Sequence, residues 1–200
     1  GKTTEEILGG VFESIGKMEI KDGKIVDVKG SMTDAGKYLT SEAVRAYLNT
    51  EFIKHGCFCP DAIIASGDQA VDPHNKGFGP LQANSLIIFD IFPRSLDNLY
   101  WYDTTRTVVK GRASAEAKRL YETVKTGQEL ALSGICDGAE GIAIHQEIVR
   151  LFQQSGYETG PQKAVIGGKE ETVMQGFFHG TGHGLGVDIH EYPRINSMSG

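Results

Sequence analysis

The amino-acid sequence predicts a domain of the α+β class. Segments with the 3.6-residue apolar spacing of helices come in pairs, and short strand-like segments are grouped between them. A βαβ protein would instead alternate single strands with single helices. No linker, low-complexity run or internal repeat divides the chain. We therefore expect residues 1–200 to form one domain with a substantial hydrophobic core.

The first quarter of the chain indicates two helices around a hairpin. Apolar residues recur at helical spacing over residues 4–17, although two adjacent glycines weaken the pattern. Residues 19–28 predict a β-hairpin that turns at an Asp-Gly pair. Thr40 or Ser41 can cap the next helix, which runs to a glycine at position 56.

The rest of the chain continues with strands, then helices, then an extended tail. Three strands are predicted at Ala62–Ala65, Ser85–Phe92 and Tyr100–Val109, the last two joined by the turn-rich PRSLDN. A long amphipathic helix starts near Ser114, with Leu120, Tyr121, Val124 and Leu130 on its apolar face. A second helix starts near Asp137 and ends before Gly156. From Val173 onward the chain is expected to be extended.

Composition argues against several classes of protein. The chain has 20 basic and 26 acidic residues, a net charge of −6, and no cluster of Lys or Arg. Nucleic acid and membrane surfaces are therefore not expected as partners. The longest apolar stretch is too short to cross a bilayer, and we find no signal peptide. Three cysteines without a CxxC pair indicate a reducing, cytoplasmic location, and we expect thiols rather than metal ligands at Cys57 and Cys59.

Two aspartates interrupt strands that would otherwise be ordinary. Asp90 lies in SLIIFDIFP, where a buried carboxylate is costly unless it is paired or bound to a cation. Taken alone, it is best explained as a strand-end residue that caps a turn. Strand alternation puts Asp103 and Thr105 on one face, so pairing of the two strands would project both aspartates into the same space. They would then need a cation, protonation of one, or neutralisation by Arg94 or Arg106.

Residues 177–195, FFHGTGHGLGVDIHEYPRI, hold three of the six histidines and a glycine at every second position from 180 to 186. His179 and His183 fall on one face of either a strand or a helix. His183 and His190 fall on opposite faces of an extended strand, unless a bulge or loop intervenes. The glycines indicate a close approach to the backbone, and no P-loop pattern supports a phosphate cradle.

The other three histidines have ordinary structural explanations when each is considered alone. His74 follows a proline in a predicted loop and is expected at the surface. His145, on an amphipathic helix, and His55, near the end of another helix, are likewise expected at the surface.

Four blocks of the sequence together resemble the metallopeptidases of the pita-bread fold, which include methionine aminopeptidases, aminopeptidase P and prolidase. The blocks are LTSEAVRAYL, IIASGDQAVDPHNKG, LIIFDIFP…YDTTRTVVKG and HGTGHGLGVDIHEYPRI, and the resemblance covers roughly residues 1–195. Its most specific part is the Asp…Asp-x-Thr-Arg-Thr hairpin followed by GHG and HE. The resemblance implies an antiparallel sheet core with paired helices packed outside.

The resemblance implies a dinuclear metal site. Asp90 would chelate one divalent ion, Asp103 would bridge both ions, and His183 would be the single histidine ligand. Such carboxylate-rich ligation suits Mn, Co, Fe or Zn. Two such ions can share a water and lower its pKa from about 15.7 towards 7.

The resemblance also implies a substrate. His74 and His190 would bind substrate and assist proton transfer, and His179 would face substrate. The methionine-specific members usually place another residue at this last position, so HGxGH favours the proline-specific branch. The implied activity is hydrolysis of Xaa-Pro bonds in short peptides or at N-terminal Xaa-Pro segments. Members of this branch are often dimers, so a homodimer is compatible with the resemblance.

The sequence departs from the family pattern in two places. Asp90 and Asp103 are slightly further apart than is typical, and DIFPRSLDN replaces the usual Asp-x-Gly start, so we expect a longer hairpin tip. The family also uses two later glutamates as ligands, and Glu191 belongs to the HE motif itself. We therefore expect a C-terminally incomplete catalytic domain that continues beyond Gly200.

Three alternative functions stay open. The chain could be a catalytically inactive pita-bread module that binds peptides or proteins, a methionine aminopeptidase, or a creatinase-like hydrolase. The intact Asp, Asp and His positions favour catalysis over the inactive module.

Overall fold

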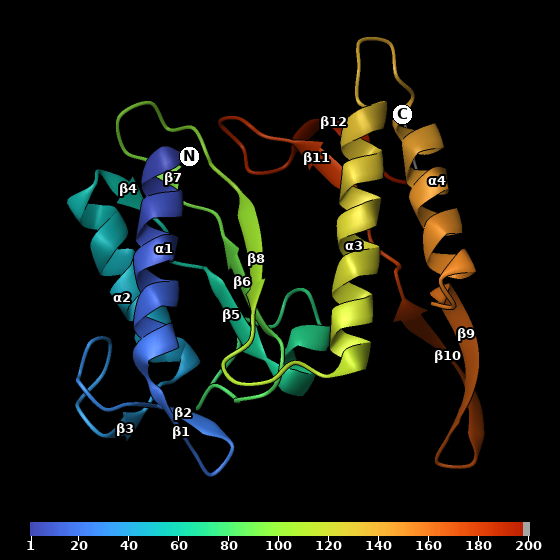
Figure 1. The fold of residues 1–200 in the computed structure, drawn as a ribbon. Helices are drawn as coiled ribbons and strands as arrows, with labels where there is room; N and C mark the ends of the chain where they lie inside the picture. The colour runs from blue at the N-terminus through green and yellow to red at the C-terminus, as the bar shows by residue number, and fades with distance from the viewer. Residues whose placement is uncertain (198–200) are drawn as a thin grey trace. The chain divides into compact units, whose positions relative to one another are not determined.

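The computed structural model describes residues 1–197, which form two compact units (Figure 1). The first unit consists of Gly1–Ala117 together with Leu185–Ile189. The second unit consists of Lys118–Gly184 together with the described residues from His190 onward.

Two helices of the first unit lie where the sequence predicts them. Helix α1 spans Lys2–Lys17 and buries Leu8, Val11 and Ile15, so its apolar spacing outweighs the two glycines, which lie on its exposed side. Helix α2 spans Ser41–Lys54. Thr40 is its N-cap, because its side-chain oxygen accepts a hydrogen bond from the Ala43 N–H at 3.1 Å.

A three-stranded antiparallel sheet follows α1. It contains β1 (Glu19–Lys21), β2 (Lys24–Asp27) and β3 (Lys37–Tyr38). The predicted turn is confirmed, with φ of 51° at Asp22 and 71° at Gly23. Positive φ at both central residues is the geometry that matches strand twist in a tight hairpin, and it is why an Asp-Gly pair occurs there.

The central sheet of the first unit has the antiparallel order β5-β6-β8, with β5 at Ile63–Ser66, β6 at Ile87–Ile91 and β8 at Thr104–Val108. The predicted pairing of residues 85–92 with residues 100–109 is therefore confirmed by β6 and β8, with Asp103 directly before β8. Figure 1 shows the three strands side by side.

The segment between β6 and β8 departs from the prediction. Strand β8 starts four residues later than expected, because the preceding chain folds over short β7 (Arg94–Ser95) rather than extending the ladder. Strand β7 in turn pairs with β4 (Cys57–Phe58), and a 3-10 helix, η1 (Gly67–Val71), follows β5. These elements are too short to show an apolar period in the sequence.

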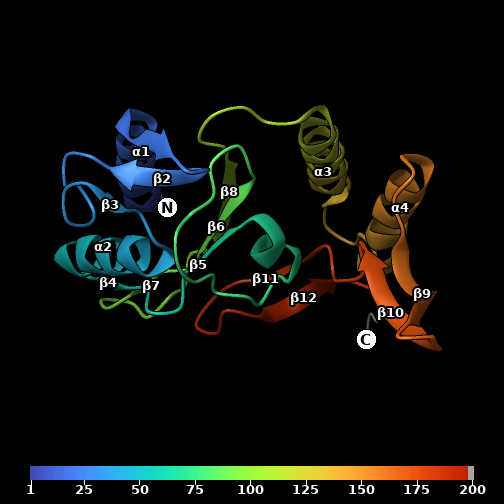
Figure 2. The same ribbon diagram turned by 90° about the horizontal axis from the view of Figure 1, so that it is seen from below.

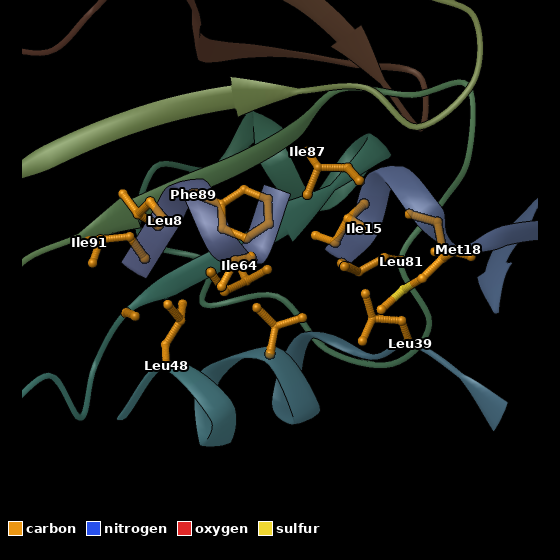
Figure 3. Close-up of a cluster of buried hydrophobic side chains, with 14 of the residues drawn as sticks. Leu8, Ile15, Met18, Leu39, Leu48, Ile64, Leu81, Ile87, Phe89 and Ile91 are labelled. Atoms are coloured by element: carbon orange, nitrogen blue, oxygen red, sulfur yellow. The ribbon is translucent and has the colours of Figure 1, made fainter. Parts of the chain in front are cut away.

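The hydrophobic core of the first unit lies between the central sheet and the two helices (Figure 3). Leu8 from α1, Leu48 from α2 and Phe89 from β6 are all at most 1% exposed. Strand β6 alternates strictly, with Ile87, Phe89 and Ile91 buried and the residues between them only partly buried. One face of the sheet therefore carries the core, and the other face is available for polar residues.

The second unit contains two helices and two hairpins (Figure 2). These elements are α3 (Ala115–Gly134, which belongs to this unit from Lys118 onward), α4 (Gly141–Gln154), β9 (Thr159–Ile166), β10 (Lys169–Gly176), β11 (Gly182–Gly184) and β12 (Glu191–Ile195). Strand β9 was not predicted, whereas the extended chain after Val173 is confirmed by β10, β11 and β12.

The predicted apolar face of α3 is wrong. Tyr121, Val124 and Leu130 are at least 36% exposed, and the buried residues of this helix are Gly127 and Ala131. A Cβ atom added at Gly127 would be in ordinary van der Waals contact with side chains of α4, including that of Phe152. The helix therefore packs through its small residues, which an apolar-spacing criterion gives little weight.

The arrangement of helices and antiparallel sheets confirms the predicted α+β class. Among residues 1–197, no helix is both long and apolar enough to cross a membrane.

One buried carboxylate organises the loop between β2 and β3. Asp27 is 1% exposed, and it accepts hydrogen bonds from the N–H groups of Met32 and Thr33 and from the Ser31 hydroxyl. Burial by itself raises the pKa of this carboxyl, but the hydrogen bonds together outweigh burial and hold the pKa below its ordinary value. The charged form therefore stabilises the folded state.

Replacing Phe52 by Ala should lower the free energy of unfolding by about 3–5 kcal/mol, because a fully buried ring would leave a cavity. The measurement is urea unfolding followed by circular dichroism. Ile53, the next residue on α2, is 53% exposed and provides the matched control. Ile53→Ala should cost less than about 0.5 kcal/mol. Equal losses from the two variants would contradict this packing.

Asp27→Asn should lower the free energy of unfolding at pH 7 by about 1.5–3 kcal/mol, the range for hydrogen bonds to a charged group. Since the folded-state pKa lies below the ordinary 3.8, the Asp27 contribution is present above that pH and is lost as pH falls through the folded pKa. Urea unfolding from pH 7 to pH 2.5 should show the variant and wild type converging in acid. Asp34→Asn, in the exposed part of the same loop, should match wild type throughout. A gap that persists unchanged in acid would refute this account.

Candidate functional site

Asp90 lies inside strand β6 rather than at its end. Its Cα partners are Ile63 on β5 and Thr105 on β8, so the turn-capping explanation is wrong. The alternation of β6 turns its side chain to the face opposite the core, where it is partly buried. The Thr105 hydroxyl donates a hydrogen bond of 2.7 Å to Asp90 Oδ1. A carboxylate is tolerated in this apolar strand because it does not face the core.

Asp103 immediately precedes β8 and is partly buried. Thr105, two residues later, lies opposite Asp90 in the ladder. Diagonal neighbours in an antiparallel pair are about 7–8 Å apart, which is within reach of a shared ligand. Asp90 thus lies in β6 and Asp103 lies directly before its partner strand β8, in the two segments whose pairing the sequence predicts.

The residues that flank Asp103 contact one carboxylate on α1. Glu5 Oε1 accepts hydrogen bonds from Arg106 Nη2 at 2.8 Å and from the Tyr102 hydroxyl at 3.0 Å. Burial, and then the hydrogen bond to Glu5, raises the pKa of the Tyr102 hydroxyl, which stays protonated as a donor. This contact joins α1 to the start of β8 on both sides of Asp103.

The two arginines that could neutralise the aspartates have other partners. Arg106 forms its ion pair with Glu5. Arg94 donates from Nε to the Leu99 carbonyl at 2.9 Å, and its guanidinium lies 5.7 Å from the centre of the Trp101 ring. These contacts argue against the alternative in which Arg94 or Arg106 neutralises the charge of Asp90 or Asp103.

The second unit brings His183 and His190 together. Strands β11 and β12 pair as an antiparallel hairpin with a register shift between His183 and Gly184. The two imidazole rings meet edge to face, with their centres 4.4 Å apart. The sequence alone placed them on opposite faces of an extended strand unless a bulge or loop intervened, and the structure contains both.

One glycine of the run is required by its surroundings. A Cβ atom at Gly184 would lie 2.2 Å from the Tyr192 carbonyl oxygen on β12, which no side chain can occupy. At Gly182 the nearest atom would be 3.8 Å away, an ordinary contact. The predicted close approach of another strand is therefore confirmed at Gly184, where β12 crosses.

The hydrogen bond of His183 selects its tautomer. Nδ1 lies 3.0 Å from the Gly184 carbonyl oxygen, and a carbonyl only accepts. In the neutral ring Nδ1 therefore carries the proton and Nε2 carries the lone pair. A ring N–H held by a backbone carbonyl is typical of histidines that bind metal through the other nitrogen.

His179 is exposed beyond the end of β10 and packs edge to face on Phe177, with ring centres 4.8 Å apart. Phe177 stacks in turn on Phe152 of α4 at 4.8 Å. His179 Nδ1 lies 2.8 Å from the Gly180 carbonyl oxygen, which indicates the same tautomer as in His183. An aromatic stack rooted in the core of the second unit thus supports this histidine.

The expected surface position of His145 is wrong, because this histidine is buried and contacts the histidine-rich segment. Its ring is 8% exposed, and Nδ1 lies 2.9 Å from the Thr181 hydroxyl oxygen, between His179 and His183 in sequence. Burial first, and then the positive charge that His179 can carry, lowers the pKa of His145, so the ring is neutral at pH 7. Its place on the apolar face of α4 was the one signal for this in the sequence.

His74 lies in an exposed turn after η1, with 93% of its side chain accessible. Its backbone N–H donates to Asp72 Oδ1 at 2.9 Å, an Asx turn that accounts for the local conformation. The predicted surface position is confirmed, and its predicted role in catalysis remains a prediction.

The proposed metal ligands divide between the two units, with Asp90 and Asp103 in the first and His183 in the second. Among residues 1–197, no three His, Cys, Asp or Glu side chains are grouped as a metal site. Cys57 is partly buried and Cys59 is buried, and all three thiols are free. Burial raises the pKa of Cys59 to about 12, which opposes the thiolate that a metal requires.

The family model that matches the chain is "Metallopeptidase family M24", and the match covers residues 3–200. One relative is an Xaa-Pro dipeptidase of Pyrococcus furiosus, 30% identical over 140 residues, which are 68% of this chain and 34% of the relative. The fold agrees with that of a prolidase from P. furiosus, with a TM-score of 0.71 and 24% identity over 98% of this chain and 49% of that one.

An X-Pro aminopeptidase from Thermotoga maritima also has a TM-score of 0.71, with 22% identity over 99% of this chain and 46% of that one. The chain therefore spans about a third to a half of the length of these proteins. The family match, the fold and the four blocks agree: the chain has the pita-bread fold and belongs to metallopeptidase family M24.

Proposed function

We propose that this protein is a metal-dependent exopeptidase that hydrolyses Xaa-Pro bonds, of the aminopeptidase P or prolidase type. The observation that carries the proposal is the pairing of β6 with β8. This pairing puts Asp90 opposite Thr105, which is two residues after Asp103. The names of similar proteins, an Xaa-Pro dipeptidase and an X-Pro aminopeptidase, support the substrate class. Short peptides with proline in second position are the proposed substrates.

The proposed metal ligands are Asp90, Asp103 and His183, and they suit two divalent ions of the Mn, Co, Fe or Zn type. Their chemistry fits: Asp90 faces away from the core, and the tautomer of His183 leaves its lone pair on Nε2. With the ions bound, the site would gain a water of lowered pKa and a polarised peptide carbonyl.

The other histidines are proposed to act on the substrate. His190, whose ring packs edge to face on that of His183, is proposed to move a proton to or from the substrate. His179 presents Nε2 outward because its Nδ1–H is held by Gly180, which makes it an acceptor for a substrate N–H or, when protonated, a donor. His74 is proposed to assist His190, from its exposed turn.

Asp103→Asn should weaken Mn²⁺ binding by at least about 100-fold, because loss of a ligand should exceed the 10–100-fold effect of losing an outer partner. Isothermal titration of the metal-free protein measures this directly. Asp97→Asn, in the exposed tip of the same hairpin, removes an equal charge and should change the affinity less than threefold. Similar losses in both variants would indicate a general charge effect and count against the ligand assignment.

His179→Gln should lower kcat/KM for Xaa-Pro dipeptides by about tenfold or more, the effect of one lost hydrogen bond to a charged group, and leave Mn²⁺ affinity unchanged. His55→Gln, an exposed histidine at the end of α2, is the control and should retain wild-type kinetics. A panel that includes Xaa-Ala and Met-Xaa peptides and creatine tests the substrate class. Preferential cleavage of Met-Xaa or creatine would overturn the proposed specificity.

A further inference from the structure

The segment between His183 and His190 is a short closed loop. Its two ends are held together, because Gly184 at the end of β11 pairs with Glu191 at the start of β12. Residues Leu185–Ile189 belong to the first unit, whereas the hairpin at their ends belongs to the second. Because only one residue separates Leu185 from His183, and none separates Ile189 from His190, the loop conformation bears directly on both imidazoles.

Trp101 holds this loop by two hydrogen bonds to consecutive carbonyls. Its backbone N–H donates to the Gly186 oxygen at 2.9 Å, and its indole N–H donates to the Val187 oxygen at 3.0 Å. Gly186 is buried, and its own N–H donates to the Asp188 oxygen at 3.1 Å. Leu185 and Val187 in the loop are at least 40% accessible, and Asp188 is also exposed. Two anchors thus fix a glycine-containing loop that has no regular structure of its own.

Trp101 is itself held in place. Its backbone forms a bridge with Arg94, and the Arg94 guanidinium lies 5.7 Å from the ring centre in a cation–π contact. The next residue, Tyr102, donates its N–H to the Pro93 oxygen at 2.9 Å. Two residues after Trp101 comes Asp103. One hydrogen-bonded stretch of chain therefore carries both a proposed metal ligand and the anchor for the loop that precedes His190.

We infer that Trp101 is a positioning residue that fixes the Leu185–Ile189 loop and thereby preorganises His183 and His190. The inference rests on the proposed function of these histidines. Binding of a metal or substrate to the two rings needs the loop in one conformation, and a loop already held loses less freedom on binding. Without the indole hydrogen bond the loop samples more conformations, and the histidine pair must be ordered when the ligand binds.

The test compares Trp101→Phe with Tyr100→Phe. The first variant keeps an aromatic ring near Arg94 and the backbone hydrogen bond, and it removes the indole N–H together with part of the ring. The control removes a polar atom from the adjacent exposed ring. Urea unfolding, Mn²⁺ titration calorimetry, and kcat and KM on an Xaa-Pro dipeptide are measured for both variants and for wild type. Hydrogen exchange of residues 184–191 in the metal-free proteins gives a readout that does not depend on metal.

Trp101→Phe should weaken Mn²⁺ binding and lower kcat/KM, each by about tenfold, the lower end of the effect of groups that orient metal ligands. Its loop should exchange faster, while its unfolding midpoint stays near that of Tyr100→Phe. Trp101 is the one tryptophan of the sequence, so it is the source of the tryptophan fluorescence of the wild type. The emission maximum should shift as Mn²⁺ is added, and the Mn²⁺ concentration at the midpoint of this shift should agree with the affinity measured by calorimetry.

The outcomes separate the two claims. Suppose that wild type binds Mn²⁺ and cleaves Xaa-Pro bonds, and that Trp101→Phe has the same Mn²⁺ affinity and kinetics as Tyr100→Phe. This result overturns the inference and leaves the proposed function intact. A lower unfolding midpoint with unchanged affinity also overturns it, because Trp101 would then be structural only. Wild type that neither binds Mn²⁺ nor cleaves refutes the proposed function and the inference with it.

Discussion

The pairing of β6 with β8 is the constraint on which the first unit depends. On one face of β6, Ile87, Phe89 and Ile91 pack into the core formed with α1 and α2. On the other face, the side chain of Asp90 points away from that core and lies next to Thr105. A one-residue slip in register would bury the carboxylate and expose the three apolar side chains. The hydrophobic effect that stabilises the core therefore also specifies the direction of the acidic side chain.

The start of β8 is held from both of its faces. Glu5 binds the Tyr102 and Arg106 side chains on one side, and the Thr105 hydroxyl binds Asp90 on the other. Exposed ion pairs contribute little when isolated, but here the Glu5 carboxylate has donors from alternate residues in and just before β8. The alternation leaves Asp103 on the side that α1 does not use. The N-terminal helix is thus joined to the candidate site as well as to the core.

In the second unit, backbone carbonyls decide the state of the histidines. Carbonyls of neighbouring glycines accept from Nδ1 of His179 and His183, so both rings have their lone pair on Nε2. The orientation of His183 depends on the β11–β12 hairpin, in which the close approach of β12 at Gly184 excludes any side chain. A buried, neutral His145 beside Thr181 supports the same segment from α4. Backbone groups of glycines and the buried imidazole of His145 thus support the exposed rings of His179 and His183.

The sequence by itself determined the fold class, the long helices, the Asp-Gly turn and the partnership of the two aspartate-bearing segments. These features follow from local periodicity and turn chemistry, which act between neighbours in the chain. It did not reveal that α3 packs through Gly127 and Ala131, that His183 and His190 meet across a bulge, or that His145 and Trp101 contact the segments they do. Only the tertiary structure decided these contacts, because each joins residues through packing or hydrogen bonds that leave no period in the sequence.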